Sequence, residues 1–485
     1  MSGQTPPTLQ KRARQTQLRD EALAISPLEK LPAVFFPPLF QEAFAGRHNT
    51  LIKTMVAAWP FHYLPVGPLI NMHNLETLQA LLDGVDMRLT RKFHPGRPKL
   101  QVLNMRNVDH VFEKWGDAND SDSDAEILDE KQVVSPSQIC TGVPRRYALR
   151  QRLKIIVDLS ISSQLNEQKA YFLNWAKQRK GSINFCCTKM KIWDASDEIL
   201  REIMKVFHPE YITELELYAN WTLLHLAHFA PYFGQMKNLE RVFLAPLHKN
   251  TSPIMNITKA SEVKCIKKMI SQFSKYNCLQ HVFMKRVHFL RDHLNQILAC
   301  LRTPLQTLSI THCLISQTDL ESFSCCHNLF KLKNLEIRGV TLFALDIMPL
   351  RGLLGKLAGT LKSLIFQWCS MKDSQLIVLL PALSQCSQLN QINFYSNDFS
   401  MDILKDLLQH TANWSKMNVD YPVPLECYDA LGHVSRERFV ELCELMDTIR
   451  AKREPKSISF ATNVCQNCGK TCVYGQGARL CSCLQ

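Results

Sequence analysis

Cysteines concentrate at the C-terminal end of the chain, in the run CQNCGKTCVYGQGARLCSCLQ at 465–485. Cys465 and Cys468 form a CxxC pair, and Cys481 with Cys483 forms a CxC pair. Four thiolates are a complete ligand set for a tetrahedral zinc ion, so this spacing predicts a structural zinc site. The alternative is a tail of reduced, free thiols, because CxC is a less usual zinc pair than CxxC.

No other residues have the spacing of a catalytic motif. The chain contains no phosphate-binding glycine loop, no Gly-x-Ser-x-Gly elbow and no HExxH helix, and its 16 histidines are scattered. We therefore expect a protein that is not an enzyme. We expect no required cofactor, and a zinc ion bound by the tail would be structural.

Composition limits the location of the protein and its partners. The chain has 485 residues, 46% hydrophobic and 21% charged, which is enough apolar surface for a large core. No apolar run approaches the roughly 20 residues that cross a bilayer, and the polar, basic N-terminus lacks the apolar segment of a secretory signal. We expect the cytoplasm, with the nucleus as a second location, and no membrane partner.

Basic residues are frequent in the segment 141–180, and the formal net charge of the chain is +13. Such a segment suits a nucleic-acid surface or a nuclear import signal, but we favour a solvated helix face. No aromatic-basic stacking motif accompanies these residues, so we do not expect nucleic acid as a partner.

One pattern repeats through the second half of the chain. Apolar residues occupy positions 1, 4 and 6, and a small, polar or cysteine residue follows near position 9. Four regular copies start 27 to 29 residues apart: Leu305-Leu308-Ile310-Cys313, Leu332-Leu335-Ile337-Val340, Leu361-Leu364-Phe366-Cys369 and Leu389-Ile392-Phe394-Asn397. This is the signature of the leucine-rich repeat. It predicts an α/β solenoid, a horseshoe in which short strands line the concave face.

Further copies extend the array in both directions. They are Ile212-Leu215-Leu217-Asn220, Leu239-Val242-Leu244, Leu279-Val282-Met284, Trp414-Met417-Val419 and an early member, Leu100-Leu103-Met105-Val108. The segment 182–192 fits loosely, and 250–264 has the composition of an inserted loop. Apolar residues spaced by three and four predict helices within 290–301, 374–386 and 403–410.

The chain divides into six predicted segments. A disordered basic N-terminus spans 1–24, a helical head 25–95, an early repeat-like segment 96–115 and a disordered acidic loop 116–135. The solenoid spans 136–450 and the cysteine-rich tail 451–485. The acidic loop has too few apolar residues to offset the entropy cost of ordering.

Short helices with clear start and stop signals make up the head. Ser26 caps a helix that Pro32 ends, a second begins at Pro37 or Pro38 and stops at Gly46, and a third runs from Asn49 toward Pro60. A fourth helix spans 73–84 and is expected to end at Gly84. Such a head can cap the first strand of a solenoid or dock a partner.

Several long stretches resemble the PRAME family of leucine-rich-repeat proteins. They are DEALAISPLEKLPAVFFPPLFQEAFAGRHNTLIKTMVAAWPFHYLPVG near the start, LQVLNMRN at 100, LSITHC at 308, LLPALSQCSQLNQINFYSN at 379 and DYPVPLECYDA at 420. The CxxC and CxC of the tail also match. The resemblance covers nearly the whole chain and implies a horseshoe that binds proteins.

This resemblance implies a substrate receptor of a cullin-2-type ubiquitin ligase, attached through elongins by a motif near the N-terminus. It also implies roles in transcriptional repression, including that of retinoic-acid signalling, and in proliferation, differentiation and apoptosis. The residues that take the docking role by this resemblance are Leu28, Leu31, Pro32, Phe35, Phe36 and Leu39. An elongin-binding box has a cysteine four residues after a leucine. In this chain, the residue four positions after Leu28 is Pro32, and the residue four positions after Leu31 is Phe35. An F-box-type adaptor therefore stays open.

The target-binding residues should lie between the buried residues of each strand, because alternate strand residues face opposite ways. On this basis Ser309, Glu336, Ile365 and Asn393 are candidates for the concave face. The leading hypothesis is a ligase adaptor that binds target proteins. The alternative is a nuclear corepressor that binds a regulatory protein without ubiquitin transfer.

Overall fold

The computed structural model describes residues 31–69, 74–90, 99–106, 152–193, 195–218, 223–246, 259–287, 291–410, 418–428, 434–435, 438, 440, 458–462 and 473–474. The chain forms two compact units. The N-terminal unit extends to Met190 and includes Ala195–Ile212, whereas the C-terminal unit comprises Lys191–Asp194 and the chain from Thr213 onward. The predicted helix capped by Ser26 lies outside the described residues.

The N-terminal unit begins with the helical head. Its elements are η2 (Ala33–Phe35), α3 (Phe36–Ala45), α4 (Asn49–Ala57), β1 (Tyr63–Pro65) and α5 (Leu75–Thr90). Pro37 and Pro38 stand in the first turn of α3, where a missing N–H breaks no helical hydrogen bond. Trp59 lies buried at the centre of the head, 5.2 Å from the Phe40 ring between centroids, and donates from Nε1 to the Tyr63 carbonyl at 3.1 Å.

Helix α5 does not end at Gly84, so this part of the sequence prediction was wrong. The helix continues to Thr90. Gly84 instead allows α4 and α5 to approach closely, because a Cβ there would lie 2.5 Å from the Lys53 carbonyl oxygen and 2.8 Å from Val56 Cβ. Glycine is therefore a packing requirement at this crossing and not a stop signal.

Repeats follow the head within the same unit. Their elements are β2 (Val102–Asn104), β3 (Lys154–Ser162), α6 (Glu167–Gln178), β4 (Asn184–Trp193), α7 (Asp197–Val206) and η4 (Pro209–Tyr211). Strand β1 pairs in parallel with β2, and β2 pairs with β3. The sheet therefore begins within the predicted head, and it joins strands that precede and follow the predicted acidic loop in the sequence. The segment 141–180, interpreted as a helix face, contains β3 as well as α6.

In the C-terminal unit, strands and helices alternate along the chain. The strands are β5 (Glu214–Tyr218), β6 (Arg241–Ala245), β7 (His281–Lys285), β8 (Thr307–Thr311), β9 (Asn334–Arg338), β10 (Ser363–Gln367), β11 (Gln391–Asn393), β12 (Asn418–Pro422), β13 (Ile458–Ala461) and β14 (Val473–Tyr474). Strands β5 to β13 are paired in parallel, and β14 is antiparallel to β13. The sheet thus continues beyond residue 450, the predicted end of the solenoid.

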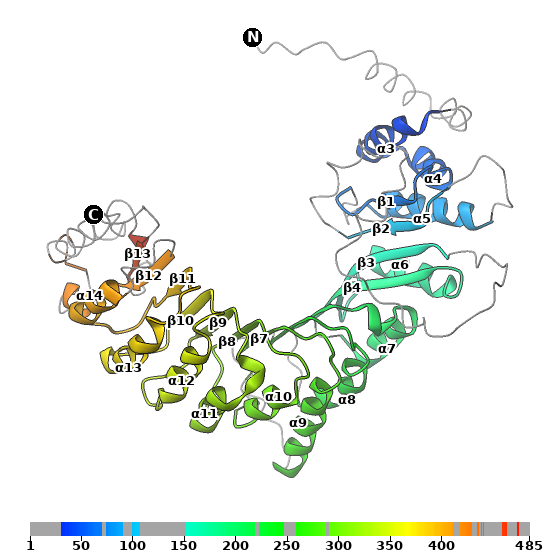
Figure 1. Ribbon diagram of the computed structural model, residues 1–485. Helices are drawn as coiled ribbons and strands as arrows, with labels where there is room; N and C mark the ends of the chain where they lie inside the picture. The colour runs from blue at the N-terminus through cyan, green and yellow to red at the C-terminus, as the bar shows by residue number, and fades with distance from the viewer. Residues whose placement is uncertain are drawn as a thin grey trace, which may run out of the picture. The chain divides into compact units, whose positions relative to one another are not determined.

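Helices cover one side of this sheet, as Figure 1 shows for β7 to β12. They are α8 (Leu223–Phe233), α9 (Lys259–Phe273), α10 (Leu294–Cys300), α11 (Gln317–Cys325), α12 (Met348–Lys356), α13 (Asp373–Leu383) and α14 (Met401–His410), with η6 (His327–Leu329) and η7 (Leu425–Cys427). The three helices predicted from apolar spacing are confirmed as α10, α13 and α14. Helix α9 begins inside the segment read as an inserted loop.

The apolar repeat positions form the core. All residues at positions 1, 4 and 6 of the four regular repeats are buried, which confirms the repeat pattern and the leucine-rich-repeat solenoid. The last predicted repeat is out of register by two residues. Val419 pairs with Ile392 and therefore occupies position 4, and Tyr421, rather than Val419, lies at the buried position 6. Within the described part of the chain, no helix is long and apolar enough to cross a membrane.

Candidate protein-binding surface

Alternate strand residues of the C-terminal unit form a row on the sheet face that the helices leave uncovered. The strand register aligns one outward residue per strand: Glu216, Phe243, Phe283, Ser309, Glu336, Ile365, Asn393 and Asp420. The residues on either side of each one are mostly buried, so the row faces away from the helices. We call this row and its outward neighbours the open face.

The four candidates for the concave face lie side by side in this row. Ser309 pairs with Glu336, Glu336 with Ile365, and Ile365 with Asn393. Glu336, Ile365 and Asn393 are half-buried, so part of each side chain is accessible. Ser309 is only 5% exposed, because its short side chain lies below those of its neighbours. It is therefore poorly placed to contact a partner.

An aromatic ladder, absent from the sequence prediction, occupies one end of the open face. Trp193 and Tyr218 stack with centroids 4.1 Å apart and planes inclined by 8°. Phe243 follows at 5.2 Å from Tyr218, and Phe283 at 6.3 Å from Phe243. All four are half-buried. The signal in the sequence was an aromatic residue at an outward strand position in successive repeats, which a search for buried leucines passes over.

Charged side chains near this ladder are paired with one another. Lys191 Nζ lies 3.0 Å from Glu216 Oε2, which also accepts a hydrogen bond from the Tyr218 hydroxyl at 3.0 Å. Arg241 and Glu214 stand 4.0 Å apart at the next outward position. These ion pairs lie beside the aromatic ladder, and their opposite charges balance, so this part of the open face has no strong charge of one sign.

The other end of the open face is also polar. Arg338 pairs with Glu336 on the same strand. Asp420 accepts hydrogen bonds from Asn393 Nδ2 at 2.9 Å and from the Tyr395 hydroxyl at 3.1 Å. These groups are fixed before any partner arrives, which lowers the entropy cost of recognition.

The residue at position 8 of each central repeat has a left-handed backbone. The φ angles are 56° at Arg286, 52° at His312, 62° at Gly339, 53° at Trp368 and 58° at Ser396. Residues with a Cβ pay roughly 1–2 kcal/mol for this conformation. The repeat imposes it, since the N–H groups of Arg286, His312, Gly339 and Trp368 all donate to the neighbouring repeat, at 2.6 to 3.1 Å.

The next residue, at position 9 of the repeat, is buried and bonded to the backbone. Cys369 Sγ donates to the Ile337 carbonyl at 3.2 Å, and Asn397 Nδ2 donates to the Phe366 and Phe394 carbonyls at 2.8 and 2.9 Å. Asn397 Oδ1 accepts from the Cys369 N–H at 3.2 Å. Burial raises the pKa of the Cys369 thiol to about 12, so it remains protonated. Cysteine here is a structural residue and not a nucleophile.

The predicted adaptor-docking residues fall into two groups. Phe36 is 3% exposed and packs edge-on against Trp59 with ring centroids 6.0 Å apart, and Leu39 is equally buried. These two are core residues of the head and are not available to a partner. Leu31 and Phe35 are half-buried and Pro32 is exposed, whereas Leu28 lies outside the described residues. Val34, which the sequence analysis did not select, is 68% exposed.

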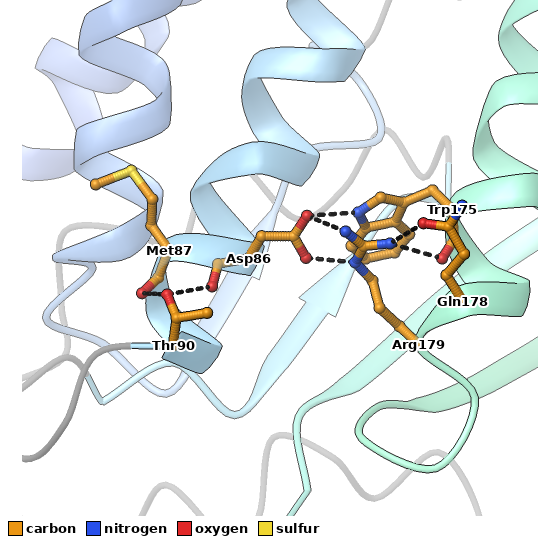
Figure 2. Close-up of polar contacts among 6 residues, drawn as sticks. All are labelled: Asp86, Met87, Thr90, Trp175, Gln178 and Arg179. Atoms are coloured by element: carbon orange, nitrogen blue, oxygen red, sulfur yellow. Dashed lines mark hydrogen bonds and ion pairs between the residues drawn. The ribbon is translucent and has the colours of Figure 1, made fainter.

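An ion pair ties the helical head to the first repeat helix (Figure 2). Arg179, at the end of α6, binds both carboxylate oxygens of Asp86 on α5, and Trp175 Nε1 donates to Asp86 Oδ2 at 3.0 Å. The Arg179 guanidinium also lies over the Trp175 ring, 4.8 Å from its centroid. Because 93 residues separate Asp86 from Arg179, no local pattern in the sequence indicates this contact.

The four cysteines proposed as zinc ligands lie outside the described residues. In the part of the chain that the structure describes, no group of three or more histidine, cysteine, aspartate or glutamate side chains is placed to hold a metal ion. A structural zinc bound by Cys465, Cys468, Cys481 and Cys483 therefore stays a prediction.

Comparison with known protein families shows to which family the chain belongs. The PRAME N-terminal domain matches residues 6–115, and the PRAME C-terminal domain matches residues 153–483. The chain belongs to the PRAME family. The PRAME family and the leucine-rich-repeat fold together make it a protein-binding leucine-rich-repeat protein.

Full-length relatives agree with this assignment. The chain is 40% identical to human PRAME family member 8 over 487 residues, covering 100% of both, and 41% identical to human PRAME family member 12, covering 98% of this chain and 96% of that one. It is 40% identical to mouse Oogenesin-3, with 97% and 93% covered.

Two solved structures show a limited likeness to the chain. An internalin from Listeria monocytogenes is 12% identical with a TM-score of 0.29, and 55% of this chain and 80% of that one are covered. A Leptospira interrogans leucine-rich-repeat protein is 13% identical with a TM-score of 0.28, and 55% and 65% are covered. The fold assignment depends on the strand register and the repeat core described above.

Proposed function

We propose that this PRAME-family chain is a non-enzymatic substrate-recognition adaptor of a cullin-RING ubiquitin ligase of the cullin-2 type. In this proposal, the open face binds the protein that is to be ubiquitinated and degraded. The start of the helical head binds the ligase through an elongin-type adaptor. Degradation of the bound regulators then affects transcription, proliferation, differentiation and apoptosis, in the cytoplasm or in the nucleus.

The unbroken outward row from Glu216 to Asp420 is the observation that carries this proposal. It crosses eight parallel strands and no helix in the described chain covers it. Protein interfaces are enriched in aromatic and arginine side chains, and the open face carries four aromatic rings, Arg241 and Arg338. Such a surface selects a partner by shape and by hydrogen bonding.

An apolar strip at the start of the head supports the ligase-binding part. Val34 and Pro32 are exposed, and Leu31 and Phe35 are half-buried beside them. Burial of such apolar side chains at an interface is favourable, because it removes apolar surface from water. Since Phe36 and Leu39 belong to the core, we assign docking to Leu31, Pro32, Val34 and Phe35.

Affinity purification of the tagged full-length chain tests both parts. We expect the native chain to recover elongin, cullin-2 and ubiquitinated targets. Val34→Asp with Phe35→Asp should lose the ligase subunits and keep the targets, whereas Ile365→Asp should do the reverse. Circular dichroism melting must show that both variants remain folded.

If the native chain recovers no elongin or cullin, the ligase assignment is wrong. Recovery of a different cullin adaptor that depends on Val34 and Phe35 would indicate F-box-type docking. A transcriptional reporter that responds equally to the native chain and to the head variant would favour a corepressor that acts without ubiquitin transfer.

A further inference from the structure

Two cations on the open face form no ion pair with the residues that the structure describes. Lys285 ends β7 and is exposed, and Arg286 follows it with a left-handed backbone. Among the described residues, no carboxylate forms an ion pair with either of them, although Lys191, Arg241 and Arg338 on the same face are all paired. Two adjacent cations attract an anionic group.

An imidazole and an indole lie along the same edge of the sheet. The rings of His312 and Trp368 stack with centroids 6.0 Å apart and planes inclined by 24°, although strand β9 lies between their strands. Gly339 makes this stack possible, because a Cβ at that position would overlap the His312 ring. Trp368 is nevertheless 42% exposed, so the stack leaves an apolar surface open to solvent.

The four side chains Lys285, Arg286, His312 and Trp368 constitute what we call the strand-end patch. They lie at the carboxyl ends of neighbouring parallel strands, with Lys285 paired to Thr311, the residue before His312. Partial burial lowers the pKa of His312, and the charges of Arg286 and Lys285 lower it further. The imidazole is therefore uncharged at neutral pH and offers a stacking surface, and the two cations supply the charge.

We propose that the strand-end patch binds an acidic linear segment of a partner protein that carries a large apolar side chain. Carboxylates of the segment contact Lys285 and Arg286, and its apolar side chain packs on the rings of His312 and Trp368. This inference depends on the proposed function, because it names the class of target that the open face takes.

Trp368 presents an exposed ring at a position where the repeat imposes a left-handed backbone. Glycine occupies the equivalent position at Gly339, where it adopts the left-handed conformation without a steric cost. A tryptophan there bears that cost, and its exposed ring recovers little through burial. Leu314 and Phe343, also exposed, follow the neighbouring strands β8 and β9, so apolar side chains recur along this edge.

A peptide fits the charges of this surface better than a nucleic acid does. The adjoining open face carries the carboxylates of Glu336 and Asp420, which repel a phosphate backbone that continues along the sheet. The patch contributes only Lys285 and Arg286 as cations, whereas nucleic-acid surfaces neutralise many phosphates. A short segment with two or three carboxylates and an apolar residue can match the patch without reaching those acids.

Fluorescence anisotropy with the full-length chain tests the inference. The probe is a labelled peptide of alternating glutamate and leucine, compared with a version that has serine for leucine and another that has lysine for glutamate. We expect the first to bind most tightly and the lysine version not to bind. Lys285→Glu with Arg286→Glu should weaken binding about tenfold or more, and Trp368→Ala several-fold.

A double variant at the opposite strand edge provides the matched control. Lys333 and Lys362 are exposed and directly precede β9 and β10, so Lys333→Glu with Lys362→Glu makes the same change of charge. It should leave peptide binding within about twofold. Loss of binding in this control would show that net charge alone acts, and would overturn the inference.

Gly339 supplies an independent check through His312. Gly339→Ala should displace the imidazole and weaken binding, but in a His312→Ala background the added methyl group has room and should have little further effect. Equal losses in both backgrounds would mean that the stack plays no part, and would overturn it.

Two further outcomes separate this inference from the proposed function. If Ile365→Asp abolishes recovery of target proteins while the Lys285 and Arg286 variant does not alter peptide or target binding, the inference alone fails. If a single-stranded RNA competes with the peptide equally well and depends on Lys285, Arg286 and Trp368, the patch is a nucleic-acid site and the inference is wrong.

Discussion

The contact between Asp86 and Arg179 should set much of the stability of the N-terminal unit. Asp86→Ala removes both acceptors of the Arg179 guanidinium and the acceptor of Trp175 Nε1. The Trp175 indole N–H then loses its acceptor, and the Arg179 guanidinium loses its counter-ion. Arg179 retains the Trp175 carbonyl, to which it donates at 3.2 Å, so its loss of partners is partial.

The magnitude follows from the burial of the pair. Side chains of Arg179 and Asp86 are 23% and 28% exposed. Breaking a fully buried pair costs about 3–5 kcal/mol, and breaking an exposed pair costs about 0.2–1 kcal/mol. An intermediate site with bidentate geometry should cost about 2 kcal/mol, which lowers Tm by about 4–8 °C in a unit of this size.

Lys53 and Asp83 provide a matched control, since Asp83 lies on the same helix α5. Their ion pair is 3.0 Å long, but the side chains are 38% and 45% exposed. Asp83→Ala should therefore cost less than about 1 kcal/mol. Differential scanning calorimetry of the full-length native chain and of each variant gives the comparison.

A double-mutant cycle of Asp86→Ala and Arg179→Ala isolates the pair itself. We expect a coupling free energy of at least about 1 kcal/mol. A cost for Asp86→Ala no larger than that for Asp83→Ala, together with no coupling, would show that the bidentate contact does not stabilise the unit and would refute the reasoning.

Three further experiments test the packing. Gly84→Ala should lower the free energy of unfolding by about 2 kcal/mol, because the methyl group meets the Lys53 carbonyl, whereas Gly359→Ala, with open space around it, should be near neutral in the same denaturation assay. Asn397→Ala should cost about 3 kcal/mol, since it leaves buried carbonyls and N–H groups without partners, and a loss below about 1 kcal/mol would contradict this. In peptide-resolved alkylation at pH 8, exposed Cys325 should react in the native chain, but Cys369, whose pKa of about 12 lies above the assay pH, should react only after denaturation.

Periodicity in the sequence was sufficient to predict the repeats, because each buried position depends on a strand that repeats the same geometry. It failed where composition concealed the period. Strand β3 lies in a strongly basic segment, and its alternating Ile155, Val157 and Ile161 do not match the leucine pattern of the later repeats. At the last repeat, Trp414 suggested a start two residues too early, and only the pairing of Val419 with Ile392 corrects it.

The binding surface was less predictable than the core. Geometry placed Glu336, Ile365 and Asn393 correctly on the open face, because outward positions follow directly from the strand period. It could not predict that Ser309 is shielded, since shielding depends on the lengths of side chains in neighbouring repeats. The stack of His312 on Trp368 was equally hidden, because it requires an absent side chain at Gly339 between them.

Stability depends on position 9 of each repeat, and recognition depends on position 8. A substitution at one of these positions can therefore change one property without changing the other. At position 9, Cys369 and Asn397 bind backbone groups of the preceding turn, and a substitution there disturbs the core. At the position before it, His312 and Trp368 project outward under the same backbone constraint, and in a solenoid only neighbouring repeats respond to a change. Gly339 has no side chain of its own to contact a partner, but its missing side chain leaves the space that the His312 ring occupies. A substitution there should therefore alter recognition and leave the buried positions intact.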